Sequence, residues 1–243
     1  MQRQSQASFS RNRLLSALTE HDFEELRPKL RRVDLAIRQV LEEPNEPIRH
    51  VYFPDPSVSS VVAITPQNER LEVGLFGSEG MSGLAVLNGT DRSPHQTFMQ
   101  VPGQAIRIEA DDLRTALDTS PSLRRLLLLY SQAQTVQISY TAMANGRFTI
   151  DERLARWLLM CHDRIDGEAF PITHEFLALM LGIRRAGVTT ALQTLETSQV
   201  IKAGRGRIEI LDRDELLAGA GDCYGVPEAE YERLIGSFKA SQA

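Results

Sequence analysis

The chain has 243 residues, enough for one large or two ordinary domains with a well-buried core. Hydrophobic residues make up 42% of the sequence and charged residues 24%, values near the average for globular proteins that exclude collagen-like, disordered and disulfide-scaffold classes. The formal net charge is -5, and this acidic balance by itself argues weakly against a nucleic-acid partner.

The sequence shows no pattern typical of a membrane span, a metal site or a catalytic site. No apolar run reaches the roughly 18 to 20 residues that a membrane span needs, and no apolar stretch of signal-peptide length follows the polar residues 1–13. We therefore expect a cytoplasmic protein. Cys161 and Cys223 lie outside any C-x-x-C spacing, and the histidines form no H-x-H or H-x3-H spacing, so we expect no metal and no cofactor. No nucleophile–base pair emerges, which disfavours an enzyme.

Two patterns follow one another in residues 14–109. Apolar residues recur at helical spacing from 14 to 30, where Thr19 and Asp22 are placed as a helix N-cap and its N3 partner. From residue 32 onward, short β-rich runs alternate with turns that contain proline or glycine. The expected strands are 33–40, 50–53, 58–64, 71–76, 97–101 and 104–108. Short strands at this spacing indicate a small barrel or jelly roll.

A long helix is expected from Pro121 to Asn145-Gly146, because no proline or glycine interrupts it. Apolar residues recur along it at alternating spacings of three and four, which is the a/d pattern of a helix that packs along another helix. This seam comprises Leu126, Leu129, Ala133, Val136, Tyr140 and Met143. A helix packed on its own barrel would need a wide apolar stripe, whereas the neighbours of the lower seam are Ser, Thr and Gln. We therefore predict that a second copy of the chain is the partner.

Residues 172–201 have the pattern of two helices joined by a tight turn. Thr173 suits the N-cap of the first helix, and Gly182 can take the positive φ that the turn requires. The positions that agree with a helix-turn-helix are Leu177, Ala178, Leu181, Gly182, Ile183 and Val188. Before these two helices, another helix is expected at 150–165, with Leu154, Trp157, Leu158 and Cys161 on its buried side.

Charges at the start of the second helix favour a DNA-binding helix-turn-helix over an ordinary helical hairpin. Arg184 and Arg185 lie where the helix dipole disfavours cations by about 0.3 to 1 kcal/mol each. Gly187 costs about 1 kcal/mol of helix propensity. A fold selected only for stability would avoid all three, but they suit a helix end that faces an anion, with the glycine allowing close approach.

A glycine-rich basic hairpin is expected directly after these helices. Residues 202–207 read KAGRGR between two β-like runs, as in the wing of a winged helix, and carry Lys202, Arg205 and Arg207. From residue 184 to 207, five basic residues stand against the single acidic Glu196, which leaves a local charge of +4. This local patch answers the objection raised by the acidic net charge.

The order of these parts resembles the Crp/Fnr superfamily of bacterial transcription regulators. The matching segments are 51–54 (VYFP), 80–84 (GMSGL), 101–103 (VPG), 152–159 (ERLARWLL) and the helix-turn-helix. The resemblance implies an α+β chain with a jelly-roll-like β-roll sensor domain at 1–120, a dimerisation helix at 121–146 and a winged helix-turn-helix domain at 147–243. It also implies a homodimer that binds a two-fold symmetric operator in double-stranded DNA, responds to a signal and contacts RNA polymerase.

The resemblance assigns residue roles only where the sequence matches. Arg185 is carried over as a base reader, but Ala186 stands where relatives similar to the catabolite activator protein have a glutamate, so that role is not carried over. Other residues expected to contact phosphates or base edges are Arg184, Gly187, Thr189, Thr190, Gln193, Lys202, Arg205 and Arg207.

The sensor domain departs from the cyclic-nucleotide pattern of the superfamily. The candidate effector-binding residues are Glu79, Gly80, Met81, Arg92 and Ser93. Arg92-Ser93 stands too far from the Pro102-Gly103 hairpin and precedes Pro94, which would move the guanidinium off a phosphate. We therefore expect another small molecule, or none, as the effector.

An alternative from another class is a ligand-binding regulatory module whose C-terminal helices contact a protein. A protein partner would not require Arg184, Arg185 and a basic wing. The sequence therefore predicts a non-enzymatic, sequence-specific transcriptional regulator that binds a pseudo-palindromic operator as a homodimer.

Overall fold

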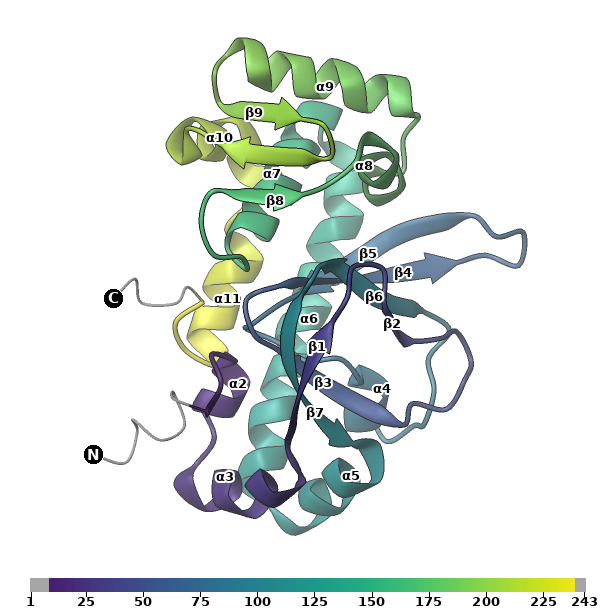
Figure 1. Ribbon diagram of the computed structural model, residues 1–243, viewed down its shortest axis with the longest axis vertical. Helices are drawn as coiled ribbons and strands as arrows, with labels where there is room; N and C mark the ends of the chain where they lie inside the picture. The colour runs from purple at the N-terminus through teal and green to yellow at the C-terminus, as the bar shows by residue number, and fades with distance from the viewer. Residues whose placement is uncertain (1–8, 239–243) are drawn as a thin grey trace.

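The computed structural model describes residues 9–238, and it shows a strand-rich N-terminal part, a long helix and a helical C-terminal part (Figure 1). The long helix α6, Pro121–Arg147, runs beside the N-terminal sheets and leads into the C-terminal part. The expected α+β fold class is confirmed. Residues 1–8, which include most of the polar N-terminal stretch, lie outside the described residues.

Short helices precede the first strand, as the leucine spacing predicts. They are α2 (Arg13–Ser16), α3 (Glu20–Leu26) and the 3-10 helix η1 (Arg27–Lys29). Thr19 is the N-cap of α3, and its hydroxyl oxygen accepts a hydrogen bond from the Asp22 amide at 3.1 Å. The predicted capping pair is therefore confirmed.

Seven strands form the two antiparallel sheets of the N-terminal part. They are β1 (Arg31–Leu35), β2 (Val40–Glu42), β3 (His50–Pro54), β4 (Val58–Ile64), β5 (Arg70–Phe76), β6 (Gln96–Val101) and β7 (Gly103–Glu109). Their orders are β1-β7-β3 and β2-β6-β4-β5. The expectation of one strand over 33–40 was wrong. Residues 36–39 form a turn in which Arg38 has a φ of 64°, so the chain passes from one sheet to the other between β1 and β2.

Helix α6 buries polar as well as apolar side chains against its own chain. Helices α4 (Leu84–Leu87) and α5 (Ala110–Thr119) precede it. Gln137 lies 5% exposed, and its side-chain oxygen accepts a hydrogen bond from the Leu75 amide at 2.9 Å. Gln134 donates to the Tyr130 hydroxyl at 3.0 Å. The inference that polar neighbours of the seam disfavour packing on the chain's own sheets was therefore wrong for these two glutamines, because both belong to the face that packs on β5 and its loop.

The C-terminal part consists of six helices and a three-stranded sheet of order β8-β10-β9 among the residues described. Its elements are α7 (Ile150–His162), β8 (Ala169–Pro171), α8 (His174–Leu181), α9 (Arg185–Thr197), β9 (Ile201–Gly204), β10 (Arg207–Ile210), α10 (Arg213–Ala220), the 3-10 helix η2 (Gly221–Cys223) and α11 (Val226–Leu234). The expected buried side of the helix at 150–165 is confirmed, since Leu154, Trp157, Leu158 and Cys161 are all buried. Helix α11 returns along α6 (Figure 1).

One apolar cluster joins the two parts of the chain. Val58 and Val62 of β4 share a cluster with Leu177 of α8 and Val188 of α9, and the Phe98 ring meets that of Phe176 edge-on at 5.6 Å. The C-terminal part is thus docked on one face of the four-stranded sheet.

A buried hydrogen bond lies within this contact between the two parts. The Trp157 Nε1 group donates to the Glu72 carboxylate at 2.8 Å. Burial raises the pKa of Glu72 to about 7, although hydrogen bonds from Ser60 and Trp157 and the Arg156 guanidinium act in the opposite direction.

None of the helices described is long and apolar enough to cross a membrane. Within residues 9–238, no group of three or more His, Cys, Asp or Glu side chains is placed to hold a metal ion. Cys161 and Cys223 are both buried free thiols.

Candidate nucleic-acid interface and sensor cavity

Helices α8 and α9 form the expected helix-turn-helix. Thr173 caps α8, its hydroxyl accepting a hydrogen bond from the Phe176 amide at 3.2 Å. Gly182 ends α8 with a φ of 63°, the left-handed conformation that glycine adopts without strain. Val188 is fully buried and anchors α9 on α8. The predicted turn geometry is confirmed.

The N-terminus of α9 is exposed and carries uncompensated positive charge. Arg184 is its N-cap residue and provides no side-chain cap, and the first turn contains no acidic residue. Arg184 and Arg185 are both exposed. The free N–H groups of a helix N-terminus and two guanidinium groups together favour a phosphate group at this end of α9.

The remaining α9 candidates differ in exposure. Thr190 and Gln193 are exposed, whereas Gly187 and Thr189 are half-buried. The Thr189 hydroxyl donates a hydrogen bond to the Arg185 carbonyl at 3.2 Å and lies 3.3 Å from Nδ1 of His174. The second contact joins α9 to α8.

Strands β9 and β10 form the basic wing. Gly204 pairs with Arg207 across the tip, and Gly206 takes a φ of 73°. Lys202, Arg205 and Arg207 are all exposed. The Glu196 side chain accepts a hydrogen bond from the Ala203 amide at 2.9 Å and so joins the wing to α9.

Sequence reasoning missed two arginines that connect elements of the C-terminal part. Arg153 of α7 donates one guanidinium nitrogen to the Leu181 carbonyl at the end of α8 and to Asn145 of α6. Arg213 bonds Asp163 at 2.6 Å. The only available signal was their position in otherwise apolar helical patterns, which does not identify a partner.

A cavity of about 340 Å³, here termed the sensor cavity after the candidate effector residues that line it, lies between the four-stranded sheet, residues 81–95 and α6. Its lining is largely apolar and includes Val61, Phe76, Met81 and Ile138. A volume of this size suits a small ligand. The predicted effector residues Met81, Arg92 and Ser93 do line it.

Two ionisable side chains of the cavity lining already have hydrogen-bond partners within the chain. Arg92 is 52% exposed and holds Asp91 through two hydrogen bonds of 2.9 and 3.0 Å. Glu42 is buried and accepts a hydrogen bond from the Gly83 amide at 2.7 Å. Burial raises the pKa of Glu42, against the opposing effect of its hydrogen bonds from Gly83 and Thr97.

Two further candidate effector residues, Glu79 and Gly80, do not line this cavity. The Glu79 side chain turns to the other side of its loop and pairs with Arg164, which follows α7. Gly80 packs against the Tyr130 ring of α6. The pairing spans 85 residues of sequence, which no local pattern could indicate.

The predicted seam of α6 is divided between two environments. Ala133 is buried on its own chain, and Leu126 packs against the same cluster. Leu129, Val136 and Tyr140 are half-buried, and Met143 is 40% exposed. These four residues lie along one side of α6 that the described chain covers only in part.

Comparison with known proteins bears on both parts of the chain. Residues 152–218 match the model of the Crp-like helix-turn-helix domain. No curated protein matches the sequence.

Solved structures share the fold over most of the chain. A protein from Eubacterium rectale assigned to the Crp/Fnr family of transcriptional regulators is 15% identical with a TM-score of 0.67, covering 85% of this chain and 97% of its own. A CRP-family regulator from Thermus thermophilus is 16% identical with a TM-score of 0.65, at 79% and 97% coverage. The c-di-GMP responsive regulator CLP from Xanthomonas campestris is 16% identical with a TM-score of 0.62, at 79% and 99% coverage.

The family match covers the helices and the wing described above, and the structural likeness extends to the sheets and to α6. The chain therefore has the fold of the Crp/Fnr transcriptional regulators and carries their Crp-like helix-turn-helix domain at residues 152–218.

Proposed function

We propose that this protein is a cytoplasmic transcriptional regulator that binds a pseudo-palindromic operator as a homodimer. The observation that carries the proposal is the exposed, uncapped N-terminus of α9 with Arg184 and Arg185, next to the basic wing. An exposed cationic helix end costs stability in a free protein and is offset when it contacts phosphates. The proposal includes no catalytic step.

The two basic elements have different roles in this proposal. Arg185 begins α9 and reads a base edge in the major groove, while Arg184, Thr190 and Gln193 contact neighbouring phosphates or bases. Arg205 at the wing tip contacts the sugar–phosphate backbone alone. RNA polymerase is the further partner that a transcriptional regulator of this kind would contact.

The test is selection of bound DNA from a random pool with the full chain, followed by footprinting. We expect a pseudo-palindrome with half-sites about one helical turn, roughly 34 Å, apart, and an affinity that falls steeply as salt rises. A chain that selects no DNA but retains a protein from a cell extract would instead support the alternative of a protein-binding regulatory module.

Arg185→Ala is expected to weaken operator binding by about 1 to 3 kcal/mol and to relax preference at one base pair, because a base contact is lost. Arg205→Ala should weaken all sequences alike and reduce the salt dependence, because only a phosphate contact is lost. Binding measured on a set of single-base operator variants separates the two results. Equal, sequence-independent losses in both variants would disprove base reading by Arg185.

We further propose that the effector, where there is one, is not a cyclic nucleotide. The Asp91 carboxylate lies against Arg92, and Glu42 places a buried carboxyl group in the cavity lining, so a bound phosphate would lie among acidic groups. Because the Arg92 guanidinium is half exposed and shared with Asp91, it would compensate such a phosphate only in part.

Calorimetry with cyclic AMP and cyclic GMP is therefore expected to show no tight binding, and operator affinity should not change when either is added. Asp91→Ala frees Arg92 and provides the matched comparison, since Asp91 and Arg92 are both solvent-exposed and their pairing contributes little to stability. Micromolar binding by the unaltered chain that Arg92→Ala abolishes would show that the cavity accepts a phosphate after all.

A further inference from the structure

In the loop between β5 and α4, each backbone carbonyl oxygen of residues 78–81 accepts a hydrogen bond from another part of the chain. Residues 77–81 of this connection are here termed the 77–81 loop. Four successive carbonyl oxygens accept hydrogen bonds, which come from Arg13 N to Ser78 (2.7 Å), Tyr231 Oη to Glu79 (2.6 Å), Asn12 Nδ2 to Gly80 (2.8 Å) and Tyr130 Oη to Met81 (3.0 Å). Donors from the N-terminal segment, from α6 and from α11 therefore converge on one short stretch of backbone.

The same loop is joined by a buried ion pair to residues 150–225. These residues contain α8, α9 and the wing and are here termed the DNA-binding half, after the proposed function. Arg164 Nε donates to Glu79 Oε1 at 2.7 Å, and the side chains are only 1% and 2% exposed. The second Glu79 oxygen accepts from the Gly77 amide at 3.0 Å, and Arg164 Nη1 donates to the Met160 carbonyl of α7 at 2.6 Å. The ion pair thus joins the backbone of the loop to the backbone of α7.

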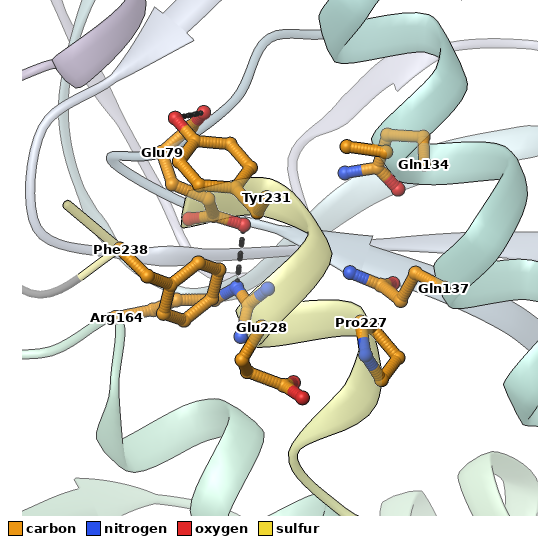
Figure 2. A pocket seen from close by; sticks show the side chains of 9 residues that line it. Glu79, Gln134, Gln137, Arg164, Pro227, Glu228, Tyr231 and Phe238 are labelled. Carbon is orange, nitrogen blue, oxygen red and sulfur yellow. Dashed lines mark hydrogen bonds and ion pairs between the residues drawn. The ribbon is translucent and has the colours of Figure 1, made fainter. Parts of the chain in front are cut away.

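The end of the chain closes over this pair. Residues 226–238, here termed the C-terminal strap, comprise α11 and the turn that follows it. The Phe238 ring lies over the Arg164 guanidinium at 5.0 Å and meets the Tyr231 ring edge-on at 5.2 Å. Figure 2 shows Phe238 beside Arg164, with Tyr231 and Glu228 reaching the same region from α11. The strap therefore covers the ion pair and bonds the loop that carries it.

Two glycines leave the loop no room to shift on its own. A Cβ at Gly77 would lie 2.4 Å from the Ser57 carbonyl and 2.9 Å from Cβ of Arg164. A Cβ at Gly80 would lie 2.4 Å from the Tyr130 hydroxyl. The backbone of the loop is thus in direct contact with both α6 and the DNA-binding half.

The other side of the loop borders the sensor cavity. Met81 is 1% exposed and lines the cavity together with Ser82 and Gly83, which continue the same backbone. Any ligand large enough to displace Met81 would move a carbonyl and an amide that Tyr130 holds at 3.0 Å each. Close-packed groups of this kind pass on a displacement instead of absorbing it.

We propose that the 77–81 loop couples the sensor cavity to the DNA-binding half, and that the C-terminal strap keeps the loop engaged with Arg164. This inference rests on the proposed function in taking α9 as the DNA-reading helix. The contacts predict that loosening the strap will release the loop, the end of α7 and the cavity wall together. If the strap only covered apolar surface, loosening it would leave the loop, the end of α7 and the cavity wall unchanged.

The test is hydrogen exchange of the full chain without DNA, comparing Tyr231→Phe with Tyr224→Phe. Tyr231→Phe removes the bond to the Glu79 carbonyl and keeps the ring. Tyr224→Phe also removes a phenol hydroxyl, but its bond goes to Asp163 within the DNA-binding half. We expect Tyr231→Phe to speed exchange about 5-fold or more in residues 77–88 and 158–165, and Tyr224→Phe to leave 77–88 unchanged.

A rise confined to α11, or an equal rise at 77–88 in both variants, would overturn the proposal. A general rise that includes β3 and β7 would also overturn it, because that result means loss of global stability and no selective link. This arm needs no DNA, so it stands whether or not the selection experiment finds an operator.

Operator affinity supplies the second arm. Where the selected operator is available, Tyr231→Phe is expected to weaken binding about 5-fold or more, because a less restrained DNA-binding half must be ordered on the operator. Glu230→Gln breaks only the surface pair of Glu230 with Arg233 on the strap, and should bind within about 2-fold of the unaltered chain, well below a typical coupling effect. Unchanged affinity in Tyr231→Phe would show that the link does not reach the DNA-reading surface.

Discussion

Replacing Glu79 with Gln is expected to lower the free energy of unfolding by about 3 to 5 kcal/mol. The change keeps the size of the side chain but leaves Arg164 with its charge buried and unpaired, since the Arg164 side chain is only 1% exposed. Its Nη2 atom already has no hydrogen-bond partner, so the ion pair is the main compensation for desolvation. Chemical denaturation at fixed protein concentration measures the loss.

Two comparisons make this result specific. Asp166→Asn breaks the exposed pair of Asp166 with Arg11, and should cost less than about 1 kcal/mol. The double variant Glu79→Gln with Arg164→Met should recover most of the loss, because it removes the unpaired charge. A Glu79→Gln variant as stable as the unaltered chain would show that Arg164 finds water or another acceptor.

Val136→Asp is expected to convert the proposed homodimer to a monomer and to reduce operator affinity by roughly 100-fold or more, because a monomer loses the linked second half-site. Val136 is half-buried on the described chain and lies on the same side of α6 as Leu129 and the 40% exposed Met143. A carboxylate there would be desolvated without a partner in the predicted helix pair. Sedimentation and operator titration measure the two effects.

Ala142→Asp is the matched control for this prediction. Ala142 is also exposed on α6, but helical geometry places it about 120° around the helix from Val136. It should remain dimeric with operator affinity close to that of the unaltered chain. If Val136→Asp stays dimeric and Ala142→Asp does not, the contact surface is on another side of α6.

Local signals in the sequence were sufficient for the elements of the candidate interface. Thr173 and Gly182 mark the ends of α8 because an N-cap and a left-handed turn depend on residues close in sequence. The same holds for the basic wing, whose tip is set by Gly206. Exposure of Arg184 and Arg185 also followed from sequence, since charged residues rarely lie fully buried without a partner.

Contacts between residues far apart in the sequence could not be predicted from such local signals. Glu79 was expected at the effector site, yet it pairs with Arg164, and both positions look like ordinary charged residues in sequence. Gln134 and Gln137 look like solvent-facing neighbours of a seam, but each finds a buried partner. Residues 33–40 have the composition of one strand, and the break at Arg38 follows from the need to change sheets.

The shared apolar cluster between β4 and the helices α8 and α9 has a consequence for how this kind of protein can diversify. Val58, Val62 and Phe98 serve the hydrophobic core of the winged helix as much as that of the sheet. Grafting this winged helix onto a different sensor would uncover Phe176 and leave Trp157 without its hydrogen-bond acceptor. The residues that contact one another across this boundary are therefore expected to change together. A substitution on one side will be tolerated only with a compensating change on the other.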